Sequence, residues 1–420
     1  MSLTSIEDHL SAILATIEPT PPSAVAVGEA LGLTLAEPVN SAVDLPGFTN
    51  SAMDGYAVRA ADCAGASAST PVSLPVVGDI AAGDTRSLTL EPGTTWRIMT
   101  GAPLPDGADA VVPVEESDGG TSQVELRLAP ETGRHLRRRG EDVAAGTEIL
   151  SAGTVLTPGR LALVAAANVP VVTVRRRPCV AVISTGDELR EPGTDLEHGQ
   201  IVDSNSLMLA ALVEASGVDV IKLPRVRDEA QAFSRALAEA AAAADLVLTT
   251  GGVSMGAYDT VKEVLSARGS VSFRKVAMRP GMPQGQGVVG PRDTPLITLP
   301  GNPLSAMVSF HVFVLPAIAG LQGRSVAADS WQAAAVPGRA VRGWRSVQGK
   351  TELTRVTLRN GAVTPATGQG SHMVGALADA NALAIVPPDV VEVAEGDVLS
   401  CLRLVGTVPA NSAHREGNGL

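Results

Sequence analysis

Residues 178–325 alternate between short apolar runs and amphipathic stretches, and this alternation constrains the fold more than any other feature of the chain. The apolar runs are CVAVIS, VDVIKL, DLVLTT, VSFRKVAM and LITLP, and the helices expected among them span 203–216, 228–243, 258–268 and 303–320. Strands that are apolar throughout are typical of a parallel sheet covered by helices on both faces. We therefore expect an α/β domain whose ligands gather at the carboxyl ends of its strands.

The remainder of the 420 residues is too long to belong to the same core and predicts further domains. Helical spacing over residues 4–18 begins with Thr4 and Glu7, which fit a capping box. Short β-type runs (VSLPVV, SLTL, TWRIM, AVVPV, VELRL) fill residues 70–130, and β-type runs return after about 330, where Asn360-Gly361 indicates a hairpin. The predicted domains are a helical and extended connector at 1–45 and 140–177, an inserted small β domain at 46–139, an α/β domain at 178–327, a C-terminal β domain at 328–408 and a disordered tail at 409–420.

Composition narrows the class of protein. The chain has 32 Lys plus Arg against 44 Asp plus Glu, a formal net charge of −12, which argues against a nucleic-acid-binding surface.

The start MSLTSIEDHL lacks the pattern of a signal peptide. We also expect no apolar run of about 18 residues that could span a bilayer. We expect a cytoplasmic protein without direct membrane insertion. Cys63, Cys179 and Cys401 are far apart and form no CxxC pair, so neither a disulfide framework nor a zinc site is indicated.

Three polar segments follow apolar strands and are expected to converge at one edge of the sheet: STGDEL at 184–189, TTGGVSMGAYD at 249–259 and LPGNPLS at 299–305. Glycines at 251 and 252 allow backbone amides to approach an anion, and a helix starting near Asp259 adds its dipole. This pattern indicates a phosphate-bearing ligand, although a turn that merely needs glycine explains it equally well. Neither GxxxxGK[ST] nor GxGxxG is present, which disfavours a P-loop and a dinucleotide cofactor.

Charged and hydroxyl groups surround the same edge. After PGNP, Pro303 suits the first position of a helix, and Ser305 follows with a hydroxyl and an amide that suit an anion. Lys275 and Arg279 in KVAMRPGMP add positive charge beside a rigid PG turn. The carboxylates expected at this edge are Asp187, Glu188, Asp228 and Asp259. Oxygen ligands beside a phosphate favour Mg2+ over zinc, while helix capping is the alternative explanation for Asp228 and for Asp203.

Seven motifs in order, over about residues 5–405, resemble the molybdopterin molybdenumtransferases, the family of MoeA and the gephyrin E domain. They are SAMDGYA at 51–57, MTGAPLPDGAD at 99–109, RRRGED at 137–142, STGDEL, TTGGVS, LPGNP and GQGSHM at 368–373. The resemblance implies a homodimer of four-domain subunits that dimerise through the connector, with a molybdopterin-binding α/β domain. It also implies adenylylated molybdopterin, a pterin nucleotide, and molybdate as substrates, with Mg2+-assisted release of AMP.

The resemblance also assigns roles to individual residues. Catalytic roles fall on Asp54, Thr100, Asp142, Glu188, Asp228, Asp259 and Lys275. The first three approach the site from the other subunit, and Glu188 and Asp259 hold the metal. Cofactor-binding roles fall on Thr185, Gly186, Asp187, Gly251, Gly252, Ser254, Pro300, Gly301, Asn302 and Pro303. Molybdate-binding roles fall on Arg279, Pro283, Ser305, Arg355 and Ser371.

One motif departs from the family pattern. The family's KPGKP segment reads RPGMP here, so Arg279 keeps a positive charge while Met282 does not. A hydrogen bond to a charged group contributes about 1.5–3 kcal/mol, and losing one weakens anion binding about 10- to 150-fold. Two interpretations therefore stay open: an active transferase, alone or with other cofactor-biosynthesis proteins, or a gephyrin-like scaffold with weakened catalysis. The scaffold would bind a peptide of a receptor, cytoskeletal or cell-division protein where the α/β and C-terminal β domains meet.

Overall fold

The computed structural model describes residues 3–252, 260–267, 269–370 and 373–406. Ser254, Asp259, Ser371 and the predicted tail at 409–420 lie outside these ranges. The chain divides into two compact units, one of Met1–Ser23, Gly32–Ala36 and Val174–Leu420, the other of Ala24–Leu31 and Glu37–Thr173. We call them the α/β unit and the small β unit and describe each by itself.

A six-stranded sheet in the order β15-β12-β16-β20-β19-β17 forms the centre of the α/β unit. Its strands are β12 (Cys179–Ser184), β15 (Asp219–Lys222), β16 (Leu246–Thr250), β17 (Val271–Lys275), β19 (Pro283–Val289) and β20 (Thr294–Leu299). The first four strands of that order are parallel, while β19 runs antiparallel to both of its neighbours. The expected α/β fold is confirmed, with this one antiparallel strand as a difference from the predicted all-parallel sheet.

Strand β19 is missing from the sequence-based expectation because its sequence, PQGQGVV, has branched residues only at its last two positions and Pro, Gln and Gly before them. Its glycines have a packing reason. A Cβ at Gly285 would lie 2.4 Å from Oγ1 of Thr298, and one at Gly287 would lie 2.1 Å from the carbonyl oxygen of Ser270. The close approach of the flanking strands therefore requires the residues that weaken the strand signal.

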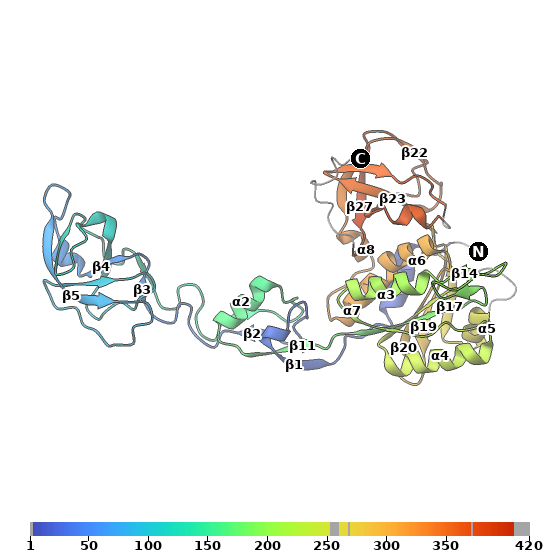
Figure 1. Ribbon diagram of the computed structural model, residues 1–420, viewed down its shortest axis with the longest axis horizontal. Coiled ribbons are helices and arrows are strands. Elements are labelled where there is room, and N and C mark those ends of the chain that lie inside the picture. Colours follow the sequence, from blue (N-terminus) through green and yellow to red (C-terminus); the bar gives the residue numbers. More distant parts are fainter. Residues whose placement is uncertain (1–2, 253–259, 268, 371–372, 407–420) are drawn as a thin grey trace. The chain divides into compact units, whose positions relative to one another are not determined.

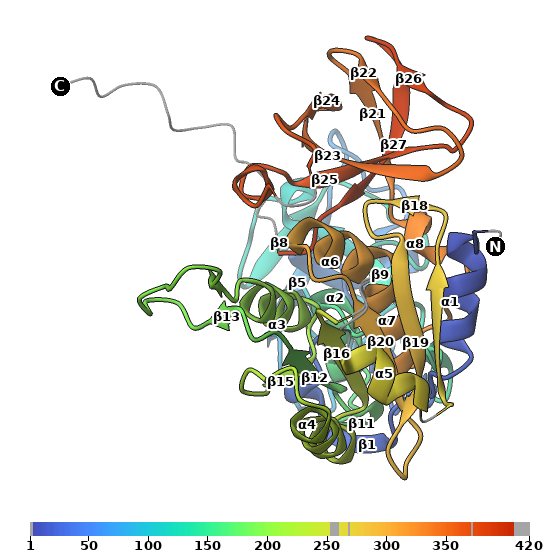
Figure 2. The ribbon, with the colours of Figure 1, turned by 90° about the vertical axis from the view of Figure 1, so that its right-hand side faces the viewer.

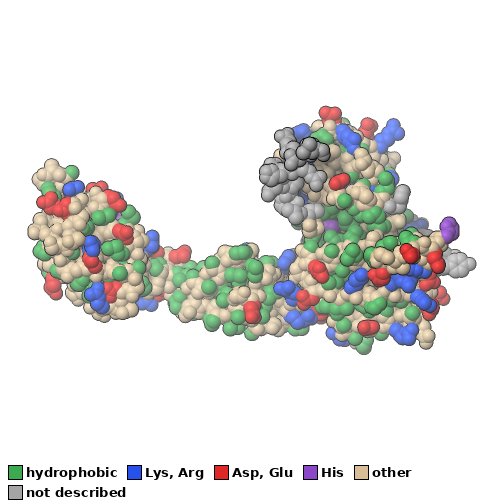
Figure 3. Space-filling model, viewed as in Figure 1, with side chains coloured by type: hydrophobic (Ala, Val, Ile, Leu, Met, Phe, Trp, Pro, Cys, Tyr) green, Lys and Arg blue, Asp and Glu red, His purple; other side chains and the backbone are tan. Residues whose placement is uncertain are grey.

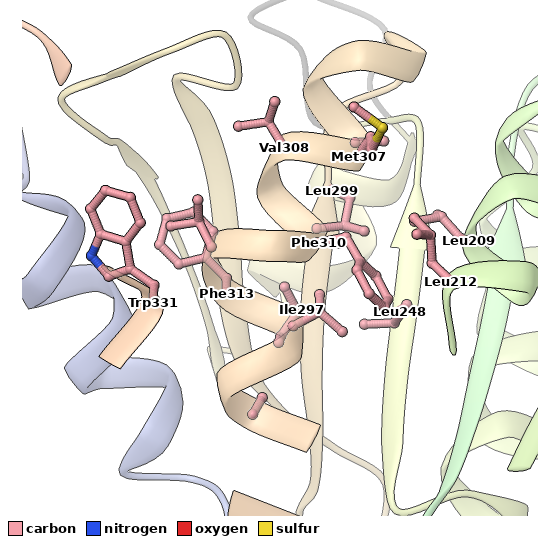
Figure 4. Packing of buried hydrophobic residues seen from close by; sticks show 14 of the residues in the cluster. Leu209, Leu212, Leu248, Ile297, Leu299, Met307, Val308, Phe310, Phe313 and Trp331 are labelled. Carbon is pink, nitrogen blue, oxygen red and sulfur yellow. The ribbon is translucent and has the colours of Figure 1, made fainter. Parts of the chain in front are cut away.

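Helices cover both faces of this sheet (Figure 1). One face carries α3 (Asn205–Ala215) and the continuous helix of α6 (Pro303–Ser309), the π-helical η4 (Phe310–Val314) and α7 (Leu315–Leu321). The other face carries α4 (Ala230–Ala243) and α5 (Thr260–Ala267). Figure 4 shows Phe310 packed among Leu248, Ile297 and Leu212 in the larger of the two cores. All four predicted helices of this region are present.

The N-terminal helix α1 (Ile6–Leu14) packs into the same core through Ile6, Leu10 and Ile13, whereas the sequence places it in the connector. The predicted capping box is wrong. Ser5 is the N-cap, and its Oγ accepts a hydrogen bond of 2.9 Å from the backbone N–H of Asp8. Thr4 lies outside the helix, where its N–H donates to the carbonyl of Lys275 and extends the edge of the sheet.

The helix spanning Pro303–Leu321 corrects another expectation. It is 19 residues long with a mean hydropathy of 1.9, so by length and composition it is able to cross a membrane, contrary to the sequence-based expectation. However, 83% of the tested window is buried inside the protein, as in the core helix of a globular domain. Within it, Nδ1 of His311 lies 2.8 Å from the carbonyl of Met307, and Nε2 accepts from the N–H of Val405 at 3.0 Å. The apolar character of this helix therefore serves packing.

A second six-stranded sheet, in the order β18-β23-β24-β21-β27-β25, belongs to the C-terminal part of the α/β unit. Its strands are β18 (Met278–Arg279), β21 (Val336–Ala340), β23 (Thr351–Arg359), β24 (Ala362–Pro365), β25 (Ala382–Val386) and β27 (Val398–Arg403). Arg359 pairs with Ala362 across the predicted Asn360-Gly361 hairpin, which is confirmed. Because β18 comes from the segment that follows β17, this sheet is joined to the α/β sheet by backbone pairing, and Figure 2 shows β23 and β25 beside α6. Smaller elements of the unit are β13 (Leu189–Arg190), β14 (Ile201–Val202), α8 (Ser330–Ala333), β22 (Trp344–Arg345) and β26 (Glu392–Val393).

The small β unit contains a five-stranded sheet in the order β7-β4-β6-β5-β8. Its strands are β4 (Gly55–Val58), β5 (Val72–Ile80), β6 (Thr95–Ile98), β7 (Ala110–Pro113) and β8 (Gln123–Leu126). Other elements in or beside the unit are β1 (Pro22–Ala26), β2 (Val39–Asn40), β3 (Asn50–Ser51), β9 (Leu136–Arg137), β10 (Glu148–Leu150), α2 (Pro158–Ala166) and β11 (Val171–Arg175). The run SLTL is not a strand and contributes only an isolated bridge from Thr89 to Asp106, while β4 is an addition to the predicted set.

Buried histidine in the α/β unit makes its stability depend on pH. His9 is fully buried, and neither of its ring nitrogens has a hydrogen-bond partner among the described residues. Burial, with a smaller contribution from Arg274, lowers the pKa of His9 from 6.5 to about 4. The unfolded chain therefore binds a proton that the folded chain does not in this pH range, so the free energy of unfolding falls as pH decreases from 6.5 toward 4.

We expect His9→Leu to reduce this loss of stability by up to about 3 kcal/mol, because leucine keeps the apolar packing and removes the titrating group. Urea denaturation at several pH values between about 7 and about 4.5 measures the effect. His198→Leu is the matched control, because His198 is exposed. Equal pH dependence of the wild type and His9→Leu would contradict the prediction.

Candidate functional site

The first cavity, which we call the strand-end cavity, has a volume of about 400 Å³ and lies at the carboxyl ends of β12, β16 and β20. Thr185 follows β12, Gly251 follows β16, and Gly301 follows β20, so the three polar segments converge as the sequence predicts. Asn302 and Pro303 complete this side of the cavity at the start of α6. Adjacent parallel strands place their ends at one edge, which brings residues more than 100 positions apart together.

Asn205, at the start of α3, connects two of these segments and is missing from the sequence-based site. Its Nδ2 donates to Oγ1 of Thr250 at 2.9 Å and to the carbonyl of Gly301 at 2.7 Å. The signal available in the sequence is only that an asparagine begins a helix after a strand, which ordinarily indicates capping. The amide instead holds the ends of β16 and β20 in register.

Three buried polar atoms in the lining of the strand-end cavity have no partner among the described residues: Oγ of Ser184, Oγ1 of Thr185 and Oδ1 of Asn205. A buried polar group without a hydrogen bond costs about 1–3 kcal/mol, and a bound ligand or an ordered water is one way to remove that cost. Two of the three are hydroxyls that both donate and accept, and the third is an acceptor. The cavity therefore suits a ligand rich in oxygen and N–H or O–H groups.

The glycine turn after β16 has a definite steric reason. Gly251 has a φ of +91°, and a Cβ there would lie 2.6 Å from the carbonyl oxygen of Thr185. A Cβ at Gly301 would meet the Cα of Gly251 at 3.5 Å, so the two turns are in contact. Gly252 also has a positive φ, of 66°. The turn thus requires glycine at 251 for packing, and Gly251 also lines the strand-end cavity.

Carboxylates occupy one side of the strand-end cavity. Glu188 and Asp203 line it, and a Cβ at Gly186 would lie 2.5 Å from Oε2 of Glu188. Oδ1 of Asp203 accepts from the N–H of Ser206 at 3.0 Å, so this carboxylate binds an N–H at the start of α3, although the N-cap residue itself is Ser204. Two carboxylates with oxygen-rich surroundings fit Mg2+, which takes oxygen ligands and retains several waters. Within the described ranges no three His, Cys, Asp or Glu side chains gather to hold a metal, and Asp259 lies outside those ranges.

Asp187 and Asp228 lie together near this edge but do not line the cavity in the described part of the chain. The N–H of Asp187 donates to Oδ2 of Asp228, and the N–H of Asp228 donates to Oδ1 of Asp187, each at 3.3 Å. Nη1 of Arg225 donates to the carbonyl of Gly186 at 3.2 Å. These contacts connect the loop after β12 to the segment 225–228.

The second cavity, which we call the β18 cavity, has a volume of about 440 Å³ and lies between the turn after β18, the start of α6 and the beginning of β23. Ser305 and Leu304 line it, whereas Pro303 lines the strand-end cavity, so the first turn of α6 lies between the two cavities. The helix that begins here is 19 residues long, and its N-terminal end favours negative charge. The remaining polar and sulfur-containing residues of the β18 cavity are Met278, Arg279, Met282, Lys350, Glu352 and Gln369.

Lys350, Glu352 and Gln369 are missing from the sequence-based site. Nη1 of Arg279 lies 3.8 Å from Oε1 of Glu352, which is buried. Nζ of Lys350 lies 3.6 Å from Sδ of Met282. Gln369 donates from Nε2 to the carbonyl of Arg355 at 3.1 Å. Only the tertiary pairing of β18 with β23 brings these residues together, so sequence spacing carries no signal for them.

Arg355 is fully buried and is not among the described residues that line either cavity. Its guanidinium donates to the carbonyl of Met373 at 2.7 Å and to the carbonyls of Gly368 and Gly370. Burial lowers its pKa from the ordinary value. Arg355 therefore holds the loop that contains Ser371, whose own structure lies outside the described residues.

Lys275 and Pro283 are register partners in β17 and β19. Lys275 is exposed and Pro283 half-buried, and neither lines the two cavities in the described ranges. Their assignment to the site therefore remains a prediction from the family pattern.

The small β unit contains the other three predicted residues. The backbone N–H and Oγ1 of Thr100 donate to Oδ1 of Asp54 at 2.6 Å and 2.8 Å, so the structure brings these two residues together. These two hydrogen bonds, the backbone bond first, lower the pKa of Asp54. Asp142 is exposed, and its N–H donates to the carbonyl of Leu45 at 3.0 Å. An ionised Asp54 is thus available at the surface of this unit.

Comparison with known proteins agrees with this architecture. Three family models match: the MoeA N-terminal region (domains I and II) at residues 4–168, a probable molybdopterin-binding domain at 181–320, and the MoeA C-terminal region (domain IV) at 337–404. The structure also superposes on the molybdopterin biosynthesis MoeA protein of Pyrococcus horikoshii with a TM-score of 0.81 and 27% identity, covering 95% of this chain and 99% of that one.

Curated relatives extend over nearly the whole chain. Molybdopterin molybdenumtransferase 2 of Mycobacterium tuberculosis is 45% identical over 403 residues, 94% of this chain and 98% of the relative. Molybdopterin molybdenumtransferase of Nostoc is 41% identical over 364 residues, 85% of this chain and 83% of the relative. With the ordered family models and the matching fold, these similarities show that the chain belongs to the MoeA family of molybdopterin molybdenumtransferases.

Proposed function

We propose that this chain is a cytoplasmic molybdopterin molybdenumtransferase, which inserts molybdate into adenylylated molybdopterin during molybdenum cofactor biosynthesis and releases AMP. The observation that supports this most strongly is the set of unpartnered polar atoms of Ser184, Thr185 and Asn205 in the strand-end cavity, next to a cavity with two cationic side chains. The gephyrin-like scaffold is not favoured, because relatives at 41–45% identity over most of the chain are named as transferases.

The strand-end cavity binds the pterin nucleotide in this proposal. The hydroxyls of Ser184 and Thr185 and the amide of Asn205 pair with its phosphate, ribose or pterin groups, and the turn of Gly251 and Gly252 admits its phosphates to the backbone. Glu188 and Asp203, with Asp259 as the family pattern suggests, would hold Mg2+. The ion would offset negative charge on the phosphates as AMP leaves.

The β18 cavity binds molybdate in this proposal. Arg279 and Ser305 face an oxyanion there, beside the positive end of the long helix. Arg355 contributes indirectly, by fixing the described residues on both sides of Ser371. Because the first turn of α6 borders both cavities, the oxyanion and the pterin nucleotide bind on either side of one rigid element.

A homodimer completes the site, since Asp54, Thr100 and Asp142 are proposed to act on the α/β unit of the partner subunit. Helix α2 of the small β unit supplies a surface for this contact. Its sequence is PGRLALVAA, yet only Val164 is buried, and Figure 3 shows hydrophobic side chains gathered in this region. A largely apolar helix that buries one residue within its own unit suits a contact with a second copy.

The activity is tested with purified full-length protein, adenylylated molybdopterin, molybdate and Mg2+. We expect the wild type to release AMP and Asn205→Ala to lower kcat/KM about 10- to 100-fold, since the amide both shapes and lines the pocket. Asn40→Ala, at an exposed position of β2, is the control. Absence of AMP release by the wild type above background would refute the proposed reaction.

Subunit complementation tests the shared site. Asp54→Asn and Asn205→Ala are each expected to be impaired, because each damages both sites of its own homodimer. After mixing and exchange of subunits, heterodimers contain one undamaged site, so activity should rise to about one quarter of the wild type. Mixtures no more active than the separate variants, although sedimentation shows dimers and co-purification of differently tagged variants shows exchange, would place Asp54 in the same protomer's site or outside it.

A further inference from the structure

The charge of the β18 cavity depends on Lys350. Of the described residues that line this cavity, Arg279, Lys350 and Glu352 are the charged ones. Arg279 lies 3.8 Å from Glu352, whose side chain is only 11% exposed, so these two charges largely offset each other. Without Lys350 the lining would be neutral overall, whereas a positive charge strengthens the hydrogen bonds to a divalent oxyanion.

The ammonium of Lys350 has unused hydrogen-bonding capacity. Its described contact is the thioether of Met282 at 3.6 Å, and sulfur of this kind is a weak acceptor. Among the ion pairs formed by the described residues, none includes Lys350. A half-buried ammonium has three donors, so Lys350 retains donors for a ligand in the cavity.

The backbone on both sides of Lys350 is held in place. The N–H of Thr351 donates to the carbonyl of Ala277 at 3.0 Å, and the N–H of Gly349 donates to the carbonyl of Pro388 at 2.7 Å. Thr351 is also the register partner of Met278 in the β18–β23 pair. Lys350 therefore enters the cavity from a fixed backbone, which reduces the entropy that binding must remove.

From these contacts we propose that Lys350 is an oxyanion-binding residue of the β18 cavity and supplies the positive charge that Met282 does not. The inference rests on the proposed function, because it identifies the cation that binds the tetrahedral molybdate anion. Residues 282 and 350 occupy neighbouring positions in space, so a charge at either position reaches the same ligand. The replacement of a cation by methionine at 282 is thus compatible with retained molybdate binding.

Molybdate binding to the purified full-length protein, measured by isothermal titration calorimetry, tests the proposal. We expect Lys350→Met to raise the Kd for molybdate about 10- to 150-fold, the effect of losing a charged hydrogen bond. Lys222→Met is the matched control, because Lys222 is an exposed lysine of β15, and its Kd should equal that of the wild type. If Lys350→Met has a lowered Tm, Lys350→Gln replaces it as the test variant.

A double variant that moves the positive charge from position 350 to position 282 distinguishes the loss of a charge from the loss of packing. We expect Met282→Lys in the Lys350→Met background to restore molybdate affinity, and the molybdate KM for AMP release should follow the same order while kcat changes less. A Kd for Lys350→Met within about twofold of the wild type overturns the proposal, as does a loss that Met282→Lys fails to restore. If the wild type itself neither binds molybdate nor releases AMP, the proposed function fails; if it does both while Lys350→Met binds equally well, only the role of Lys350 fails.

Discussion

The pairing of β18 with β23, together with the core beneath it, is the constraint on which both cavities depend. Met278 and Arg279 pair in parallel with Thr351 and Glu352, so a short strand from the α/β segment becomes part of the C-terminal sheet. Under this pair, the C-terminal residues Leu353, Leu383 and Leu402 share one hydrophobic cluster with α1, α3 and the long helix 303–321. Each fully buried leucine contributes about 1.5–3 kcal/mol, so the two sheets are fixed to each other and not merely adjacent. Lys350 and Gln369 reach the β18 cavity, and Val374 reaches the strand-end cavity, because of this junction.

The elements that the sequence predicts correctly are those whose signal is local. Apolar runs such as CVAVIS are buried on both faces of the sheet, and the Asn360-Gly361 turn has positive φ at both residues, of 50° and 79°. The elements that escape prediction obey tertiary requirements. Strand β19 needs glycine at 285 and 287 to admit its neighbours, and that need removes the residues by which a strand is recognised. Helix α1 is amphipathic, but nothing in its spacing tells which core it joins, and its cap is Ser5 because Thr4 pairs with the sheet edge.

The site residues fall into the same two groups, those with a local sequence signal and those without one. The segments after β12, β16 and β20 are predicted to meet because the geometry of parallel strands requires it, and the structure places them around one cavity. Asn205 has no such rule, because its partners Thr250 and Gly301 are 45 and 96 positions away. Arg355 is the opposite case, because the family pattern identifies this residue but does not predict its contacts. A family pattern identifies an arginine near the anion, but only the structure shows that both Nη atoms of its guanidinium donate to the backbone carbonyls of Gly368, Gly370 and Met373.

The overall charge of the chain has a consequence for how the anions are bound. A protein with a net charge of −12 does not attract molybdate or a nucleotide from a distance, and at physiological salt interactions beyond about 8 Å are largely screened. In the proposed sites, affinity must therefore come from contacts inside the cavities, and Lys350 is the one described cation of the β18 cavity besides Arg279, which is paired with Glu352. A buried carboxylate beside the proposed anion site is costly unless it orders a cation, and Glu352, as the register partner of Arg279, is placed to do so. The β18 cavity thus combines Arg279, which Glu352 orients, Lys350 and the N-terminal end of the helix 303–321. The positive charge of this set is small and is confined to the cavity.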